Sequence, residues 1–313
     1  MMNQVDLVTD VPSQKTPKPV KSSVPFVDRI TRKEFYEEFV NKGKPVVIRG
    51  MAKNWKALEW DSEYFKSMET GKKVSIKTGN IEKGEKRNIF LSNFVELLEA
   101  YEEDLKKGLN PKKVGYLHDL PFFYMFPEYV KDISPFPYEH LLPEWYWSKW
   151  QNYIQFFMGT TGSLTPLHFD TLLTNNLFFQ VVGKKKFILI DVKGKDNCYI
   201  EGWRWAKFNP DKPDYEKFPN AKNVNIMEVV IGPGDILYMP SGMLHQVHGL
   251  SRSISFNIDW HTKESAKRGV RTLWQGAPMK NVYYNSLIYL GLSLKIPSKY
   301  IFPFYKSYLN YVS

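Results

Sequence analysis

Two histidines and one aspartate have the residue types and spacing of ligands to a single metal ion. His168 and Asp170 form an H-x-D pair in the segment TPLHFD, which we predict to be a strand. Side chains two positions apart on a strand share one face, so both can reach the same ion. A second imidazole from a distant part of the chain would complete a facial triad and leave part of an octahedral site open. This ligand set is typical of non-haem iron(II) oxygenases.

The third ligand must come from the other histidines, of which the chain has few, with six in total. His245 and His248 both follow the strand-like segment GPGDILYMPSGM. In an extended strand these two positions point to opposite faces, so only one of them can face the interior. His245 is nearer to the Pro-Ser-Gly turn, and we expect it to be the ligand. His248 remains the alternative.

The elements that would position these residues are strands. Short apolar and aromatic runs, each closed by Gly, Pro, Asn or Asp, recur from about residue 152 onward; they are YIQFFMG, NNLFFQVVG, KFILID, NIMEVVIGPGD, ILYMP and SISFNIDW. This pattern is typical of an all-β sandwich or barrel and not of alternating strands and helices. A polar segment, residues 192–225, interrupts it.

Before residue 152 the sequence pattern predicts helices and one strand. Thr31 and Glu34 have the spacing of a capping box, which predicts a helix over residues 31–40. Further predicted elements are a buried strand over residues 45–48 and helices over residues 61–69 and 91–107. Residues 1–25 contain no apolar run, and we predict a disordered leader there.

Composition limits the class of protein and its compartment. The single cysteine, Cys198, excludes an intramolecular disulfide. With no secretory leader and no long apolar run in the sequence, this favours a reducing compartment. We expect a cytoplasmic protein, with the nucleus as an alternative.

Beyond the triad, seven blocks of sequence occur in an order that resembles the JmjC-type, cupin-fold hydroxylases. The blocks are KPVVIRGMAKNW, YLHDLP, TPLHFD, NNLFFQVVGKKKF, NPDKPDYEKFPNAK, GPGDILYMPSGMLHQV and SISFNIDW. Within these hydroxylases, the chain is most similar to the group of the hypoxia-inducible factor asparaginyl hydroxylase and the tRNA wybutosine hydroxylase. The resemblance covers most of residues 26–262, which we take as the catalytic domain.

This resemblance implies a mainly β fold, a double-stranded β-helix (the jelly roll of cupins) with flanking N-terminal and C-terminal helices. It also implies iron(II), 2-oxoglutarate as co-substrate, and O2. The residues that match the family's co-substrate pocket are Thr165, Lys185, Tyr116, Asn176 and Asn257. Such a pocket is physically reasonable, because a buried dicarboxylate needs a cation and several neutral donors.

The chain departs from the family pattern after the H-x-D pair. Nine residues, TLLTNNLFF, separate Asp170 from Gln180, two more than in the pattern that we would align. The assignment of Asn176 to the pocket, and not Asn175, is therefore open. A longer loop beside the metal would also reshape the entrance for substrate.

The resemblance leaves several functions open. The leading hypothesis is hydroxylation of a C–H bond on a protein or peptide side chain. The alternatives are hydroxylation of a modified RNA nucleoside, oxidation of a small-molecule natural product, and a cupin that binds a ligand without turnover. Hydroxylation and demethylation differ only in which C–H bond is presented, so the reaction class alone does not name the product.

Residues 263–313 form a basic and aromatic C-terminal segment. It contains eight basic residues and one acidic residue. An apolar run from Val282 to Lys295 predicts a helix, which Pro297 should end. Since related family members dimerise through C-terminal helices, we expect a homodimer here. The alternatives are docking on an anionic membrane surface, with Lys295, Lys299 and Lys306 at the lipid, and packing on the chain's own core.

Overall fold

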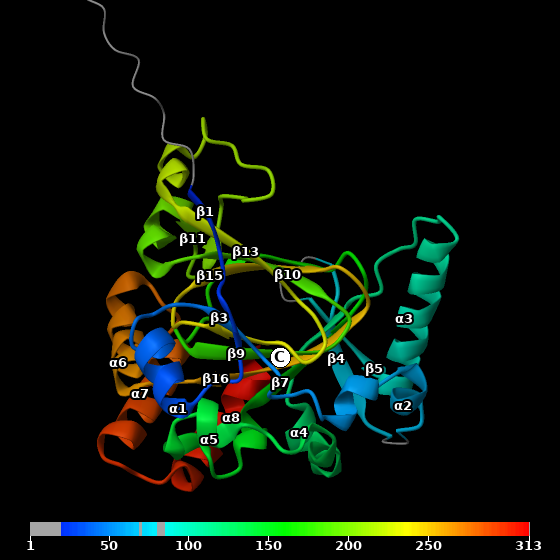
Figure 1. Ribbon diagram of the computed structural model, residues 1–313, viewed down its shortest axis with the longest axis horizontal. Helices are drawn as coiled ribbons and strands as arrows, with labels where there is room; N and C mark the ends of the chain where they lie inside the picture. The colour runs from blue at the N-terminus through cyan, green and yellow to red at the C-terminus, as the bar shows by residue number, and fades with distance from the viewer. Residues whose placement is uncertain (1–19, 69–70, 80–84, 313) are drawn as a thin grey trace, which may run out of the picture.

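Two β-sheets face each other at the centre of the molecule, and the labelled helices lie mainly against the outer side of the second sheet and beside it (Figure 1). The computed structural model describes residues 20–68, 71–79 and 85–312. The first sheet has the strand order β1 (Val20–Ser23), β13 (Asn225–Ile231), β10 (Lys185–Ile190), β15 (Leu244–Gly249), β8 (Leu164–His168), β12 (Trp205–Ala206) and β11 (Ile200–Glu201). The second sheet has the order β2 (Phe26–Asp28), β3 (Val46–Arg49), β14 (Ile236–Met239), β9 (Asn175–Val182), β16 (Ser253–Trp260), β7 (Ile154–Gly159), β6 (Tyr116–Leu120), β4 (Lys73–Lys77) and β5 (Lys86–Phe90).

The central strands form the double-stranded β-helix that the sequence predicts. From β7 to β10 the chain alternates between the two sheets, and it does so again from β13 to β16. Strands β7–β10 and β13–β16 form the barrel, and within each sheet they pair antiparallel with one another, as β10 does with both β13 and β15. Because of this winding, β8 lies beside β15 although a long stretch of sequence separates them. The predicted fold class is confirmed.

The helices lie mainly on the outer side of the second sheet and beside it. They are α1 (Arg32–Glu34), α2 (Ser62–Lys66), α3 (Leu91–Lys106), α4 (Phe122–Met125), α5 (Tyr138–Leu141), α6 (Lys263–Arg271), α7 (Met279–Ser293) and α8 (Ser298–Val312). The capping box of Thr31 and Glu34 is present at α1, which continues as π-helical turns over Phe35–Val40. No helix in the described part of the chain combines the length and apolar character needed to cross a membrane.

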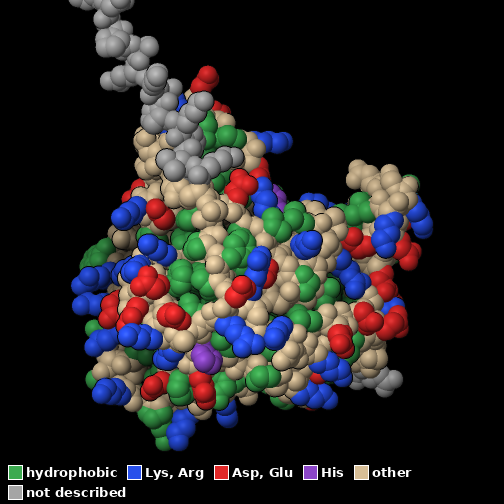
Figure 2. All heavy atoms as spheres, viewed as in Figure 1, with side chains coloured by type: hydrophobic (Ala, Val, Ile, Leu, Met, Phe, Trp, Pro, Cys, Tyr) green, Lys and Arg blue, Asp and Glu red, His purple; other side chains and the backbone are tan. Residues whose placement is uncertain are grey.

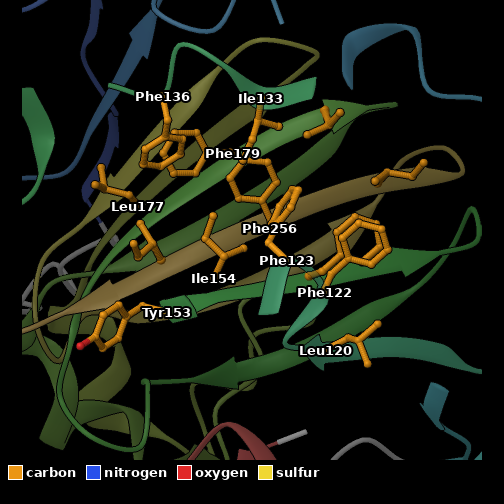
Figure 3. Close-up of a cluster of buried hydrophobic side chains, with 14 of the residues drawn as sticks. Leu120, Phe122, Phe123, Ile133, Phe136, Tyr153, Ile154, Leu177, Phe179 and Phe256 are labelled. Atoms are coloured by element: carbon orange, nitrogen blue, oxygen red, sulfur yellow. The ribbon is translucent and has the colours of Figure 1, made fainter. Parts of the chain in front are cut away.

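The main hydrophobic core lies between the second sheet and the N-terminal helices. Figure 3 shows its aromatic centre, with Phe122, Phe179 and Phe256 among the labelled side chains. The ring of Phe179 stacks on that of Phe256, and the ring of Phe122 stacks on that of Phe156. Full burial of one such side chain contributes roughly 1.5–3 kcal/mol, so this cluster is a large part of the fold's stability. Figure 3 shows Phe256 on the side of β16 that faces this core.

The opposite side of the same strand is polar. Ser255, Asn257 and Asp259 alternate with Phe256 and Ile258 along β16, and all five are buried. Successive side chains on a strand point to opposite faces, so the polar set points into the space between the two sheets. One face of the second sheet thus packs on the aromatic core. Its other face lines the interior of the barrel, where a second apolar cluster, which includes Phe157, Phe178 and Leu237, adjoins the polar cavity.

Part of the predicted disordered leader is a strand. Residues 20–23, within the predicted leader, form strand β1, which pairs in parallel with β13. Ser22 Oγ also donates a hydrogen bond to Asn225 Oδ1 at 3.0 Å. Main-chain pairing with a sheet edge requires no apolar run, which is why composition missed this strand. Residues 1–19 lie outside the described residues.

The C-terminal segment folds back on the barrel and on the N-terminal part of the chain. Five of its apolar residues are buried in the main core: Ala266, Tyr284, Ile288, Ile301 and Tyr305. The predicted helix extends over Met279–Ser293 and ends before Pro297. A second set of apolar side chains remains exposed; among the described residues it comprises Leu273, Trp274, Met279, Tyr283, Leu290, Leu294, Tyr300 and Phe304.

Candidate active site

The pairing of β8 with β15 brings two histidines together. His168 and His245 are direct partners across the two strands, and the centroids of their rings lie 4.2 Å apart. Asp170 follows two residues after the end of β8, so the H-x-D pair does not lie within one strand as predicted. The chain turns after β8, where the Leu173 amide donates a hydrogen bond to the Asp170 carbonyl. The carboxylate still reaches the histidines, with His245 Nε2 and Asp170 Oδ1 3.7 Å apart.

These three side chains could hold one metal ion. One potential ligand atom from each lies within 4.8 Å of the others, and no other such group of three occurs among the described residues. The Nδ1 atoms of His168 and His245 lie 2.8 and 3.2 Å from the carbonyl oxygens of Pro166 and Met243. A carbonyl can only accept, so each Nδ1 carries the proton and each Nε2 keeps a lone pair for a metal.

The protonation state of His168 also suits a ligand. Burial, followed by the charges of His245 and Arg204, lowers the pKa of His168 well below its usual range. A neutral imidazole is the form that binds metals, so His168 is ready to bind over the physiological pH range.

His248 lies outside this group. Its Nε2 atom is 3.0 Å from Asp211 Oδ2, and Gln246 Nε2 contacts both residues. The register of β15 against β8 shifts between His245 and Val247, and His245 lines the cavity whereas His248 does not. His245, and not His248, is therefore the histidine that the structure brings to His168.

The candidate metal group opens into a cavity of about 320 Å³ between the sheets. All five residues predicted for the co-substrate pocket line or border it: Thr165, Lys185, Tyr116, Asn176 and Asn257. Lys185 is only 1% exposed, and its Nζ atom donates hydrogen bonds to Tyr116 Oη at 3.0 Å and Ser255 Oγ at 2.8 Å. The aromatic rings of Tyr116, Phe157 and Phe178 surround the ammonium group.

The environment of Lys185 suits an incoming anion. Burial lowers the pKa of Lys185 to about 7. Among the described residues, no carboxylate forms an ion pair with it, whereas its neighbour Lys186 lies 3.6 Å from Glu228. A buried cation is costly without a counter-charge, so a carboxylate bound in the cavity would remove a large part of this cost.

The two asparagines after Asp170 have different surroundings. Asn175 faces away from the cavity and accepts hydrogen bonds from Tyr238 Oη at 2.8 Å and the Ser241 amide at 3.3 Å. Asn176 lines the cavity, where its Nδ2 atom donates to Asp170 Oδ2 at 3.2 Å and to Asp259 Oδ1 at 2.9 Å. Asn176 therefore links the candidate ligand Asp170 to a second buried carboxylate.

Asp259 was missed by sequence reasoning. Besides Asn176, Asn257 Nδ2 lies within donor distance of Asp259 Oδ1, at 3.4 Å. The carbonyl oxygens of both asparagines are buried without a hydrogen-bond partner and so could accept from a bound ligand. The signal for Asp259 was available in SISFNIDW, since this residue alternates in phase with Asn257.

The wall of the cavity contains a further charged cluster that the sequence did not suggest. His118 Nδ1 lies 2.5 Å from Asp119 Oδ2 and 3.1 Å from Lys77 Nζ. On the other side, Trp205 is the strand partner of His168, and the two rings are 4.9 Å apart. Arg204 stacks on Trp205, with its guanidinium carbon 4.7 Å from the ring centroid.

Comparison with known proteins places this arrangement in a family. The family described as "Cupin-like domain" matches residues 32–266, which is most of the chain. The chain belongs to the cupin-like family. Its relatives include proteins named for the JmjC domain, so it is a cupin-like domain of the JmjC type, as the sequence blocks indicated.

Three relatives illustrate the range of this group. "JmjC domain-containing protein D" of Dictyostelium discoideum is 30% identical over 73% of this chain and 55% of its own length. "tRNA wybutosine-synthesizing protein 5" of Gallus gallus is 25% identical over 76% of each chain. "Lysine-specific demethylase 8" of Xenopus tropicalis is 24% identical over 77% of this chain and 53% of its own. The chain thus spans about half the length of two of these three relatives.

The first prediction compares the two candidate histidines as metal ligands. His245→Ala should weaken the binding of Co(II) or Mn(II) by more than about a hundredfold, since loss of an outer-shell partner alone costs ten- to a hundredfold. His248→Ala, the matched control in the same strand, should leave affinity unchanged. Calorimetric titration of each purified variant measures this. Equal weakening by both, or weakening by His248→Ala alone, would contradict the assignment.

Proposed function

We propose that this protein is an iron(II)- and 2-oxoglutarate-dependent oxygenase that hydroxylates a C–H bond on a protein or peptide side chain. The observation that carries the proposal is the buried Lys185 in the same cavity as the group of His168, Asp170 and His245. Among the described residues Lys185 has no carboxylate partner, and this cation together with two imidazoles and one carboxylate suits a metal-bound dicarboxylate.

In this proposal each side of the cavity has a separate task. His168, Asp170 and His245 hold the iron, and Lys185 binds the distal carboxylate of 2-oxoglutarate with support from Tyr116. Thr165, Asn176 and Asn257 offer further polar contacts to the co-substrate. The bound iron, with O2, supplies the oxidative chemistry that couples decarboxylation of 2-oxoglutarate to hydroxylation. The protein's own contribution is to position both reactants and to exclude water.

RNA is the second candidate substrate. One relative is named as a tRNA wybutosine-synthesizing protein, and the chain carries a net charge of +10. Another relative is named as a lysine-specific demethylase, so removal of a methyl group is the alternative reaction on a protein.

We also propose that the protein is cytoplasmic, on the basis of its single cysteine.

The direct test supplies the purified protein with iron(II), 2-oxoglutarate and O2. Peptide, RNA and metabolite pools are then offered in separate reactions. Succinate should form, and mass spectrometry should find a gain of one oxygen in the peptide pool. Absence of succinate in every reaction would contradict the proposed activity. An oxygen gain in RNA alone would identify RNA, and not a peptide, as the substrate.

A second prediction concerns the lysine. Lys185→Ala should weaken 2-oxoglutarate binding roughly ten- to a hundredfold, the usual contribution of a charge-assisted hydrogen bond, and leave metal binding intact. Lys186→Ala is the matched control, because this neighbour is partly exposed and lies beside Glu228. If Lys185→Ala bound 2-oxoglutarate with normal affinity, Lys185 would not be the residue that binds its distal carboxylate.

The same lysine should make co-substrate binding depend on pH. The ammonium form binds the carboxylate, and burial lowers the pKa of Lys185 to about 7. Raising the pH from 7 to 9 therefore converts the free protein to the neutral amine, and affinity should fall by up to about tenfold per pH unit. Lys185→Arg keeps its charge and should bind with little pH dependence over this window. A flat profile for the wild-type protein would contradict this role.

We also propose that the protein is a homodimer that uses the exposed apolar side chains of α7 and the segments beside it. Leu290 and Leu294 are 49% and 66% exposed and lie at the C-terminal end of this helix. Because other residues of the segment belong to the core, a point variant is a better test than truncation. Light scattering should show a dimer for the full chain and a monomer for Leu290→Asp/Leu294→Asp. A monomeric wild-type protein at tens of micromolar would contradict the dimer, and vesicle flotation would then test the membrane alternative.

A further inference from the structure

Both sheets extend beyond the barrel at the same edge, beside the candidate metal site. In the first sheet β12 and β11 continue beyond β8, and in the second sheet β6, β4 and β5 continue beyond β7. Strands β7 and β8 follow each other in sequence, and each is the last barrel strand of its sheet at this edge. Residues from both extensions line the cavity: Arg204 and Trp205 from the first, and Lys77, Lys86 and His118 from the second.

The first extension is attached directly to the metal ligands. The amide of Phe169, which lies between His168 and Asp170, donates a hydrogen bond to the Arg204 carbonyl at 3.3 Å. Trp205 pairs with His168 along the strand and packs against its ring. The guanidinium of Arg204 stacks on Trp205, so its position is coupled to that of the metal site.

The second extension presents its charges toward Arg204. Burial and then neighbouring charges, among them Arg204 and Lys86, lower the pKa of Lys77. The charge of Arg204 also acts on His118 and Asp119, after the larger effects of burial and of their mutual contact. Residues of both extensions line the same cavity, so their charges act on one another there.

An unusual backbone conformation brings the second extension's polar groups together. Asp119 has φ of 57°, in the left-handed region that few residues other than glycine adopt. The register of β6 against β7 shifts at this place, between Leu117 and Leu120. Neighbouring strand residues normally point to opposite faces, yet His118 and Asp119 both line the cavity. Asp119 is thereby held beside His118 and Lys77, and its carboxylate partly balances the cations.

Two further cations line the entrance beside this pairing. Lys86 and Arg204 both line the cavity, and among the described residues neither forms an ion pair with a carboxylate, whereas Lys77 lies 3.7 Å from Asp119. Cations that face each other repel, and the repulsion is relieved when an anion lies between them. Because Arg204 stacks on the ring beside His168, that anion would lie next to the C–H bond presented to the metal.

We propose that this entrance is a subsite for a carboxylate of the substrate, so that the enzyme selects peptides in which an Asp or Glu is at, or next to, the hydroxylated residue. The inference rests on the proposed function and names its substrate class. Arg204 is the main contact, because its planar guanidinium can bind a carboxylate with two parallel hydrogen bonds. Lys77 and Lys86 contribute charge from the opposite side.

The test offers the full-length protein two peptide libraries that differ only at the central residue. One library has Asp or Glu at this position and the other has Asn or Gln. Binding is measured with iron(II) and 2-oxoglutarate present and O2 absent, so that no turnover occurs. The wild-type protein should retain the acidic library at least about tenfold better, and Arg204→Gln should lose this preference, as expected for one charge-assisted contact.

Two further variants separate this role from a structural one. Lys86→Gln lies on the opposite extension and should reduce the preference severalfold without disturbing the contact between Trp205 and His168. Lys207→Gln is the matched control, because Lys207 is on the same segment as Arg204, does not line the cavity, and pairs with Glu201 at 2.9 Å. It should behave like the wild-type protein.

Each outcome bears on one proposal. Equal retention of both libraries by the wild-type protein would overturn the subsite, as would an unchanged preference in Arg204→Gln and Lys86→Gln. Binding of single-stranded RNA that depends on Arg204, without a preference among peptides, would overturn the peptide assignment. Succinate formation by the wild-type protein without substrate is measured separately and reports on the proposed oxygenase activity alone.

Discussion

The candidate active site depends on the antiparallel pairing of β8 with β15. Main-chain hydrogen bonds place His168 directly opposite His245, and the turn after β8 brings Asp170 to the same place. Because a shift by one residue would turn a strand's side chains to the other face, the register of this pair decides whether a metal site can exist. The alternation of the chain between the two sheets is what makes β8 and β15 neighbours. The rest of the barrel can be understood as support for this one contact.

The second sheet meets a different constraint, since it must bury polar groups and aromatic groups on opposite faces. On β16, Phe256 packs in the aromatic core while Asn257 and Asp259 face the cavity. Lys185 lies across the cavity with hydroxyl partners and aromatic rings around it. A cation in such a place is costly unless it is paired, and the aromatic core stabilises the fold enough to tolerate it. Burial of this cation therefore lowers the stability of the fold, a cost that a bound carboxylate would reduce.

Sequence reasoning predicted the fold from the recurring strand pattern, and it grouped His168, Asp170 and His245, which the structure brings together. The five residues assigned to a co-substrate pocket came from the family resemblance. They line one cavity, and their role in binding a co-substrate stays a prediction. Strand alternation also separated His245 from His248. It missed β1, since pairing at a sheet edge leaves little trace in composition. It could not find Arg204 and Trp205, whose importance arises only because a polar insertion folds back onto β8. Nor could it show that Asp119 faces the cavity, because this requires a local departure from strand geometry.

The most direct test of this account is an anaerobic titration of the metal-free protein with iron(II) and then 2-oxoglutarate, followed by visible absorption. When the keto and carboxylate oxygens of 2-oxoglutarate chelate iron(II), a charge-transfer band appears. We expect the maximum absorbance of this band to be proportional to the concentration of the wild-type protein, and we expect the band to be lost in Asp170→Ala. A folded wild-type protein without the band, or an undiminished band in Asp170→Ala, would contradict the claim that the paired strands β8 and β15 build an iron and 2-oxoglutarate site.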